Sequence, residues 1–433
     1  MIDNSYHTPS KSKGVLMFVL LLSSYVIFSM NWVAGSNLAK QITSYYFNGQ
    51  SVSPLVSEVV NYTITIARII ANLSAAYVLV KLNPKKAAMF ALACLTFSFI
   101  AIFSPNYWLY TIARMIMALG GSMIMIFINA YVAKFISRDK RIITSAFITA
   151  AYNFGAALVA ILFLLFKEQL IKNWQYTMTG FSIISIVTLI LWIIISEDFK
   201  SYTNWSKPNY FVYKFYLESV DYSNEIIETD KYSFKKALKD KFIYFFSFGF
   251  GGFLFLYIMP LVSLPNKVFE AVGGNFRPEF MILSVTLGGI LGTIVSIFVG
   301  RLNFRRKPFL LTHGTIMILS MSLALYFAYT NVTLSYMLMF LSGFSMYSQY
   351  PVYLNYPYEM PNMSAEKLTI LFGILWAFGY AIYTIFNFVW SIVLQSYGYK
   401  TSLVFYIIGS SIYVLFVTML PETRKKQKNN YIL

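Results

Sequence analysis

The stretch Lys81-Leu82-Asn83-Pro84-Lys85-Lys86 lies between two long apolar segments of the chain. A second basic stretch, Arg301-Leu302-Asn303-Phe304-Arg305-Arg306, lies between two further apolar segments, at an offset of 301 − 81 = 220 residues. A basic turn that recurs in the same setting indicates that one helical unit was duplicated.

The composition is typical of a membrane protein. The chain has 433 residues, of which 58% are hydrophobic and 12% charged, whereas soluble domains carry about 25% charged residues. Apolar segments of about 20 residues recur, which is the length that crosses ~30 Å of hydrocarbon. We therefore expect an all-α polytopic membrane protein embedded in the lipid bilayer. The net charge of +17 does not indicate a nucleic-acid partner, because the basic residues lie between the apolar segments.

Twelve spans are predicted, and most connections between them are short. They cover residues 14–38, 54–80, 87–103, 107–135, 142–166, 174–195, 242–264, 280–299, 309–329, 334–358, 368–394 and 402–420. The long connection divides the chain into a first six-helix bundle (1–195), a central loop (196–241) and a second six-helix bundle with a basic tail (242–433).

The distribution of Lys and Arg predicts the orientation. Of the 34 such residues, 26 fall in the connections on the side of the termini, 6 on the opposite side, and Arg68 and Arg114 inside apolar segments. Because positive connections stay in the cytoplasm, we expect a multi-pass protein of the cell (plasma or inner) membrane with both termini cytoplasmic. The single cysteine, Cys94, excludes an internal disulfide.

The duplication continues beyond the basic turn. Gly121 corresponds to Gly343 at an offset of 222, Phe154-Gly155 to Phe378-Gly379 at 224, and Trp174-Gln175 to Tyr399-Lys400 at 225. Small changes in loop length explain the drift. Parallel repeats of six helices, related by an axis along the membrane normal, are a known plan of transporters.

These residues resemble motifs of the major facilitator superfamily. The basic part of the family's cytoplasmic signature is present at Lys81, Lys85 and Lys86, with a second copy at Arg301, Arg305 and Arg306. The span-four pattern R-x-x-x-G-x-G-G falls on Arg114, Ala118, Gly120 and Gly121. The resemblance implies twelve helices in two pseudo-symmetric halves, transport by alternating access, and a structural or coupling role for Arg114. The Gly-Pro run of drug/proton antiporters is absent from residues 150–157.

Arg68 is the most informative single residue. It lies near the middle of the second span, where a charge costs at least about 2.5–3.5 kcal/mol, so we expect it to face a wet cavity or a partner. The acidic residues lie in loops or near helix ends, the nearest being Glu58. Arg68 is therefore a candidate anion-binding group, and the alternative is a structural arginine bonded to carbonyls and to hydroxyls such as those of Thr63 or Thr65. The absence of buried acids favours an anionic or neutral substrate.

Aromatic and amide side chains complete the candidate site. Trp376, Tyr380 and Tyr383 recur at one face of a helix, and rigid aromatic bodies with polar tips suit small polar metabolites. The alternative is that these side chains serve packing or the interfacial belts. The candidate substrate-binding residues are Arg68, Asn31, Trp32, Arg114, Tyr152, Asn153, Tyr257, Gln349, Tyr350, Trp376, Tyr380 and Tyr383.

The expected function is transport rather than catalysis. We expect a secondary active or facilitative transporter of a small organic anion, such as a carboxylate or sugar phosphate. A neutral sugar or nucleoside-like metabolite is the alternative substrate, and a transporter-like sensor that binds without transport is the alternative class. The spans contain no nucleophile–base set and no metal-ligand cluster, so we expect no enzyme activity, no catalytic residue, no cofactor and no metal. We expect the protein to act as a monomer.

Overall fold

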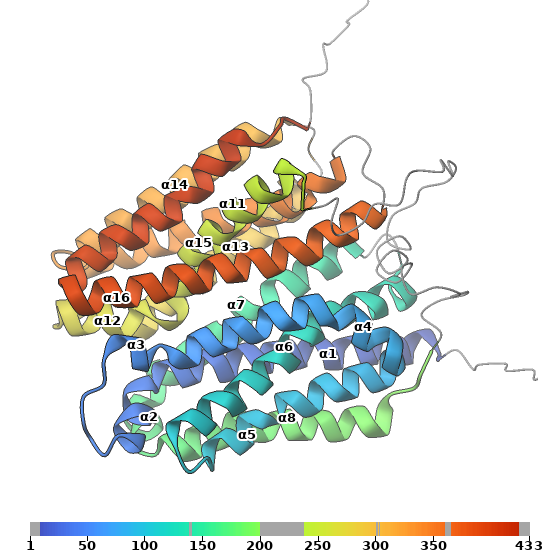
Figure 1. The fold of residues 1–433 in the computed structure, drawn as a ribbon, viewed down its shortest axis with the longest axis horizontal. Coiled ribbons are helices and arrows are strands. Elements are labelled where there is room, and N and C mark those ends of the chain that lie inside the picture. Colours follow the sequence, from blue (N-terminus) through green and yellow to red (C-terminus); the bar gives the residue numbers. More distant parts are fainter. Residues whose placement is uncertain are drawn as a thin grey trace, which may run out of the picture.

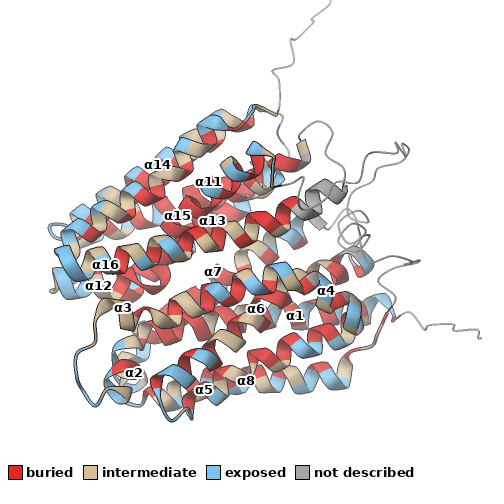
Figure 2. Ribbon diagram, in the orientation of Figure 1, coloured by how far each residue is buried: buried red, intermediate tan, exposed pale blue. Residues whose placement is uncertain are grey.

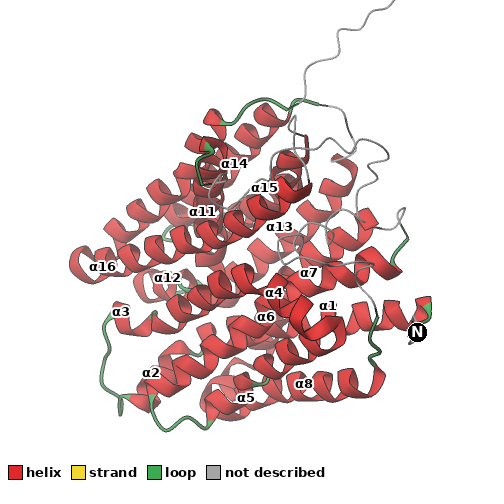
Figure 3. Ribbon diagram, turned by 45° about the vertical axis from the view of Figure 1, so that its right-hand side comes forward, coloured by secondary structure: helices red, strands yellow, loops and turns green. Residues whose placement is uncertain are grey.

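The structure is a computed structural model that describes residues 9–137, 141–199, 238–299, 302, 304–359 and 365–423. These residues form helices and connecting loops, and the described ranges contain no strand (Figure 3). Most of the predicted central loop lies outside the described residues. So do Arg301 and Asn303 of the second basic turn, and the basic C-terminal tail from residue 424.

The first part of the chain forms eight helices. They are α1 (Lys11–Asn37), α2 (Ala39–Tyr46), α3 (Pro54–Ser57), α4 (Val59–Leu95), α5 (Phe97–Ile102), α6 (Tyr107–Phe135), α7 (Arg141–Lys172) and α8 (Trp174–Ile195). The second part forms α11 (Lys241–Val262), α12 (Leu264–Val272), α13 (Pro278–Val299), α14 (Arg306–Phe327), α15 (Val332–Asn355), the 3₁₀ helix η3 (Tyr356–Glu359) and α16 (Ala365–Met419). Within the described ranges, nine helices are long and apolar enough to cross a membrane.

Two of the long helices each contain two of the predicted spans. The backbone of α4 breaks at Asn83, where φ is 63°, and that of α16 breaks at Gly398, where φ is 79°. Asparagine and glycine tolerate this left-handed region better than other residues, and Pro84 cannot continue the hydrogen bonding of the preceding turn. With these two breaks, each predicted span falls on a helical segment, so the all-α polytopic fold is confirmed.

The two basic turns are held in equivalent ways. The backbone N–H of Lys85 donates to the Asp198 carboxylate (3.4 Å), and the backbone N–H of Arg306 donates to that of Glu422 (2.9 Å). The two acids follow the sixth and twelfth spans, at an offset of 422 − 198 = 224 residues. This matches the offsets of the sequence repeat. The two halves therefore share this local architecture as well as their helix order.

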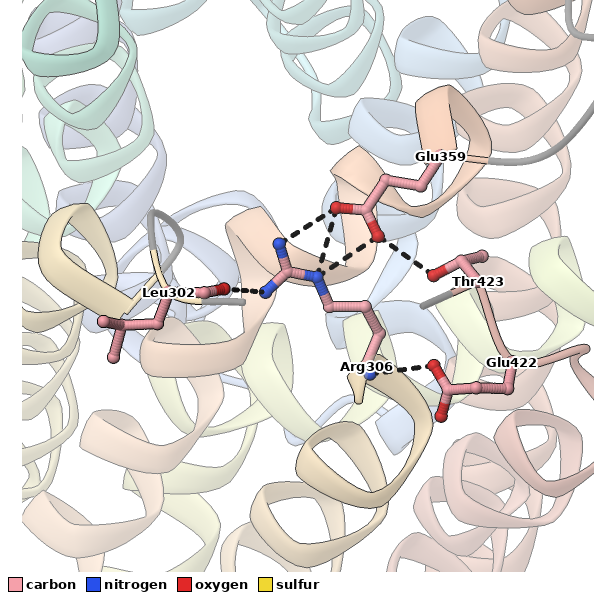
Figure 4. Close-up of polar contacts among 5 residues, drawn as sticks. All are labelled: Leu302, Arg306, Glu359, Glu422 and Thr423. Atoms are coloured by element: carbon pink, nitrogen blue, oxygen red, sulfur yellow. Dashed lines mark hydrogen bonds and ion pairs between the residues drawn. The ribbon is translucent and has the colours of Figure 1, made fainter. Parts of the chain in front are cut away.

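The second turn carries a fuller polar cluster (Figure 4). The buried Arg306 guanidinium donates from Nε and Nη2 to the Glu359 carboxylate at 2.9–3.2 Å, and from Nη1 to the carbonyl of Leu302 at 3.4 Å. Thr423 Oγ1 donates to Glu359 Oε2 at 2.9 Å. The cluster ties the start of α14 to η3 and to the segment after α16, which fixes this end of the second half.

Paired glycines allow equivalent helices to approach closely. A Cβ on Gly155 of α7 would lie 2.6 Å from the carbonyl oxygen of Val26 on α1, and a Cβ on Gly379 of α16 would collide with the Phe250 ring on α11. Because α1 and α11 are the first spans of their halves, the Gly155–Gly379 correspondence in the sequence is also a correspondence in space.

The two halves lie against each other along their length. In Figure 1, α1–α8 form the lower block and α11–α16 the upper one, and α4 contacts α16 while α7 contacts α13. Buried residues gather between the helices, and exposed residues lie outside (Figure 2). Large apolar side chains are exposed on the outer helix faces, including Ile194 (73%), Phe298 (65%) and Ile408 (62%). Such apolar faces are stable in contact with lipid chains, because the helix satisfies the hydrogen bonds of its own backbone.

Candidate functional site

A cavity lies where the two halves meet. The empty space between its walls, including the part open to solvent, is about 560 Å³. Helices α1, α4, α6 and α7 of the first half and α11, α15 and α16 of the second line it. The lining residues are Tyr25, Trp32, Arg68, Met125, Ile148, Thr149, Tyr152, Phe253, Leu254, Tyr257, Ile258, Tyr347, Tyr350, Leu354, Trp376 and Tyr380.

Arg68 is the one charged side chain among these lining residues. It is 3% exposed, and its Nη2 donates to the Tyr25 hydroxyl at 3.4 Å. Its guanidinium carbon lies 4.5 Å from the ring centroid of Tyr380 and 5.4 Å from those of Phe28 and Trp32. Thr63 and Thr65 donate to backbone carbonyls of their own helix instead. Arg68 is thus positioned by aromatic rings and by one tyrosine hydroxyl.

The electrostatics of Arg68 are unusual for a buried cation. The negative faces of aromatic rings stabilise a cation by roughly 0.5–2 kcal/mol, with the larger values in desolvated sites. Within the described ranges Arg68 forms no ion pair with a carboxylate, and its Nε is buried without a hydrogen-bond partner. The cavity therefore offers one positively charged, donating edge to a ligand.

Polar groups from both halves converge on the same cavity. The Tyr257 hydroxyl donates to Asn153 Oδ1 at 2.9 Å, and the Tyr152 ring meets the Trp32 ring edge-on at 5.8 Å. The Tyr152 hydroxyl is buried without a partner in the described part of the chain. Because an unsatisfied buried polar group costs about 1–3 kcal/mol, this hydroxyl favours the binding of a polar ligand.

Seven of the twelve sequence-predicted residues line the cavity, and five do not. Those that line it are Trp32, Arg68, Tyr152, Tyr257, Tyr350, Trp376 and Tyr380. Those outside its lining are Asn31, Arg114, Asn153, Gln349 and Tyr383. Asn153 lies directly behind the lining, since it accepts the hydrogen bond from Tyr257.

Asn31 and Arg114 serve packing inside the first half. Arg114 is fully buried, and its Nη2 donates to the backbone carbonyl of Asn31 at 2.7 Å. The Asn31 amide donates to the carbonyl of Phe181 (3.3 Å) and accepts from Ser182 (3.2 Å). The two residues therefore join α1 to α6 and α8. This geometry corresponds to the structural role that the family resemblance implies for Arg114.

Gln349 and Tyr383 are buried within the second half. Gln349 Oε1 accepts from the Tyr413 hydroxyl at 2.8 Å, and its Nε2 lies 3.0 Å from the sulfur of Met317. Tyr383 is fully buried, with its ring 6.3 Å from that of Phe255. Trp376, Tyr380 and Tyr383 follow one face of α16, but only the first two line the cavity. Tyr383 does not, because α16 also packs on α11.

Two cavity residues that the sequence reasoning missed had a visible signal. Tyr25 lies seven residues before Trp32 and Tyr347 three residues before Tyr350, so each shares a helix face with a predicted residue. The apolar lining residues, such as Met125 and Phe253, had no such signal. They are indistinguishable in the sequence from other core side chains.

The expectation that no acid is buried was wrong. Glu58 is 6% exposed, and its Oε2 accepts from Ser263 (2.7 Å), Asn61 (2.8 Å) and Asn387 (3.3 Å). Glu279 is 3% exposed and forms an ion pair with Lys167 at 2.8 Å. Both acids stand near helix ends, as predicted, but the opposite half of the chain covers them. The sequence therefore gives no reason to exclude a cationic ligand.

The region around Glu58 joins the two halves on the side that the sequence assigns to the cell exterior. The Tyr62 hydroxyl and Ser391 Oγ lie 2.6 Å apart, as do the hydroxyls of Thr65 and Thr384. Among the described residues, the hydrogen bonds and ion pairs between the halves lie between the cavity and these ends. Helix α3 contacts α16 there, at the left of Figure 1. These contacts close the cavity at this end of the interface between the halves.

Comparisons of sequence agree with the fold. A sequence profile described as Major Facilitator Superfamily matches residues 16–383. A protein of Mesomycoplasma hyopneumoniae (strain J), described as uncharacterized, is 24% identical over 414 residues, which cover 88% of this chain and 82% of that protein. A Mycoplasma genitalium protein described as a major facilitator superfamily transporter is 25% identical over 315 residues, covering 67% of this chain and 53% of that protein.

Solved structures of the same fold include two sugar carriers. A D-xylose–proton symporter superposes with a TM-score of 0.69 at 16% sequence identity, covering 96% of this chain and 100% of that one. The fucose:proton symporter of E. coli superposes with a TM-score of 0.60 at 13% identity, with the same coverage. The repeat, the fold and the match over most of its length show that this chain belongs to the major facilitator superfamily of membrane transporters.

Proposed function

We propose that this chain carries a small hydroxyl-rich metabolite of the sugar class across the cell membrane by alternating access. The observation that carries the proposal is the cavity between the two halves, which is closed on its outer side and contains unpartnered polar groups. A ligand held there would reach one side of the membrane at a time as the halves rock. The two sugar symporters of the same fold support this choice of substrate class.

The chemistry of the cavity walls suits a sugar. Aromatic rings provide flat apolar surfaces, and the hydroxyls of Tyr152, Tyr347 and Tyr350 can donate to or accept from substrate hydroxyls. Because three rings already face the Arg68 guanidinium, its charge does not require an anionic ligand. Arg68 then acts as a hydrogen-bond donor to a neutral oxygen.

An organic anion is the second candidate substrate. The observation in its favour is that Arg68 has no carboxylate partner among the described residues and keeps an unpartnered Nε. A guanidinium edge binds a carboxylate or phosphate with two parallel hydrogen bonds. A sugar phosphate would offer a phosphate to the guanidinium and hydroxyls to the tyrosine side chains.

The proposal includes the arrangement in the membrane. The moving bodies are the halves 1–195 and 242–433, joined by the loop 196–241, and both termini lie in the cytoplasm. The proposed working unit is a monomer.

The test is uptake by proteoliposomes that contain the purified protein. Radiolabelled pentoses, hexoses, their phosphates and small carboxylates are offered in turn, with protein-free liposomes as the control. We expect saturable uptake of a neutral sugar. Uptake of a phosphate or carboxylate alone would select the second candidate, and binding without flux of any ligand would show a sensor instead of a carrier.

A further inference from the structure

Glu58 is a buried carboxylate without a positive partner. It lies between α3 and α4 at the outer end of the interface between the halves and is 6% exposed. The other buried acid in the described ranges, Glu279, is neutralised by Lys167, and the half-buried Glu359 is neutralised by Arg306. Burying an uncompensated carboxylate is costly. The three neutral donors on Oε2 supply hydrogen bonds but no net positive charge.

Two oxygen atoms on the side of α16 that meets this carboxylate have no hydrogen-bond partner among the described residues. The three hydrogen bonds to Glu58 all end on Oε2, and Oε1 accepts none from the residues that the structure describes. The Asn387 amide lies next to the carboxylate, and its Oδ1 is buried without a partner. The Tyr383 hydroxyl, one turn away on the same face of α16, is also buried and unpartnered. Carboxylate, amide and hydroxyl oxygens are the ligands that hard cations prefer.

We propose that a small monovalent cation of the size of Na⁺ binds between Glu58 Oε1 and the free oxygens of Asn387 and Tyr383. One carboxylate balances one positive charge, so the donor set suits an alkali-metal ion better than a divalent ion. The described residues hold no group of three or more His, Cys, Asp or Glu side chains that would suit a divalent or transition metal.

A second cavity lies beside the helical turn that carries Glu58. It has an empty volume of about 300 Å³, and its lining includes Ser57 and Asn61, which flank Glu58 in the sequence, together with the hydroxyl-bearing Ser36 and Thr43.

One asparagine connects the cation site with the substrate cavity. Asn61 Nδ2 donates to Glu58 at 2.8 Å, and Asn61 Oδ1 accepts from the Trp32 indole at 3.0 Å. Trp32 lines the substrate cavity and faces Arg68. A change in the position of either ligand is thus transmitted through a single amide.

The bound cation would hold the outer side closed. Glu58 and Asn61 belong to the first half, whereas Ser263, Tyr383 and Asn387 belong to the second. An ion between them binds the closed arrangement and is released when the halves separate, so it shifts the population toward closure. This coupling rests on the transport function proposed above, but the binding of the ion does not.

The test measures ion binding in the absence of any transported substrate. The thermal unfolding of the detergent-purified protein is followed in NaCl, KCl and choline chloride at equal ionic strength. At a Na⁺ concentration 100 times its Kd, we expect Tm to rise by about 3 °C relative to choline. Glu58→Gln should abolish the rise. The matched control Glu279→Gln should keep it, because the carboxylate removed there is already paired with Lys167.

Each remaining outcome also decides the proposal. Should Glu58→Gln fail to fold, Asn387→Ala keeps the carboxylate and must reduce the Na⁺-dependent rise. An equal rise in all salts, or a rise that survives in both variants, overturns the site. The wild-type Tm could instead vary with pH but not with Na⁺. If Glu58→Gln removes this pH dependence, the charge of Glu58 is neutralised by a proton, and the cation site is overturned. A Na⁺-dependent rise without any uptake in proteoliposomes refutes the transport function while leaving the cation site in place.

Discussion

The substitution Arg68→Gln tests the substrate site most sharply. Glutamine keeps a neutral donor at about the position of the arginine Nε, but it removes the charge and the contacts with the three rings. A hydrogen bond from a charged group contributes about 1.5–3 kcal/mol. At ~1.4 kcal/mol per tenfold change, a sugar should bind about 10- to 150-fold more weakly. For an anionic ligand the loss is larger, because removing one member of a buried charge pair costs about 3–5 kcal/mol.

A second buried arginine provides the matched control. Arg114 also lies inside a span and is fully buried, but its guanidinium bonds to the backbone of Asn31 and is not part of the cavity lining. Arg114→Gln should lower Tm through the lost contact between α1 and α6. It should leave the ligand affinity of the folded protein unchanged.

The assay is calorimetric or scintillation-proximity binding of the transported ligand to detergent-purified variants. Their folding is checked by size-exclusion chromatography. The reasoning is refuted if Arg68→Gln folds and binds the ligand as tightly as the wild type. It is equally refuted if the two substitutions weaken binding by the same factor, because Arg68 would then have no special place in the site.

Three further substitutions test the fold and the closure. Glu359→Gln removes the carboxylate that the buried Arg306 guanidinium contacts at 2.9 Å, so the free energy of unfolding should fall by about 3 kcal/mol, measured by thermal or denaturant unfolding. Gly343→Leu places a side chain against the backbone of α13 and should prevent folding. Gly180→Leu should be tolerated, because the space around Gly180 is open. The two variants are compared by their yields of monodisperse protein. Ser391→Ala removes a 2.6 Å hydrogen bond across the outer closure and should increase outward opening about fivefold, measured by labelling of a cysteine in the cavity.

The outcomes that contradict these expectations are distinct. An unchanged unfolding transition for the first variant would mean that the polar cluster around Arg306 adds nothing to stability. Equal yields of the two glycine variants would mean that α13 and α15 do not pack as closely as the structure shows. Unaltered cysteine labelling in the third would mean that the closure does not depend on this bond.

The helices could be predicted because their signals are local. Twenty apolar residues are long enough to span the bilayer wherever the rest of the chain lies, and the Asn83-Pro84 pair ends a helix through its own backbone chemistry. The repeat was also accessible, since equal offsets in the sequence reflect equal positions in space, as Gly155 and Gly379 show.

The site was only partly predictable because it depends on how each helix is rotated. Arg68 and Arg114 have the same local signal, a charge inside an apolar span, yet only Arg68 faces the cavity. Which face of a span meets water is decided by the packing of the other helices. Tyr383 likewise follows the stripe of Trp376 and Tyr380 in sequence, but the contact of α16 with α11 buries it.

The burial of Glu58 illustrates a non-local effect. Its partners Ser263 and Asn387 are 263 − 58 = 205 and 387 − 58 = 329 residues away. Nothing near Glu58 in the sequence indicates that a loop acid will be enclosed. Only the docking of the second half onto the first creates this environment, and that docking also makes the closed outer side.

The most direct test of the account is the distance between the outer ends of the two halves. Spin labels are placed at the exposed positions Pro105 and Thr330, one in each half, after Cys94 has been replaced by serine. Pulsed electron-spin measurements in lipid should show a short and a longer distance, with their proportions changed by the bound ligand. A single distance that stays constant while the ligand demonstrably binds would contradict the claim that the halves open and close around the cavity.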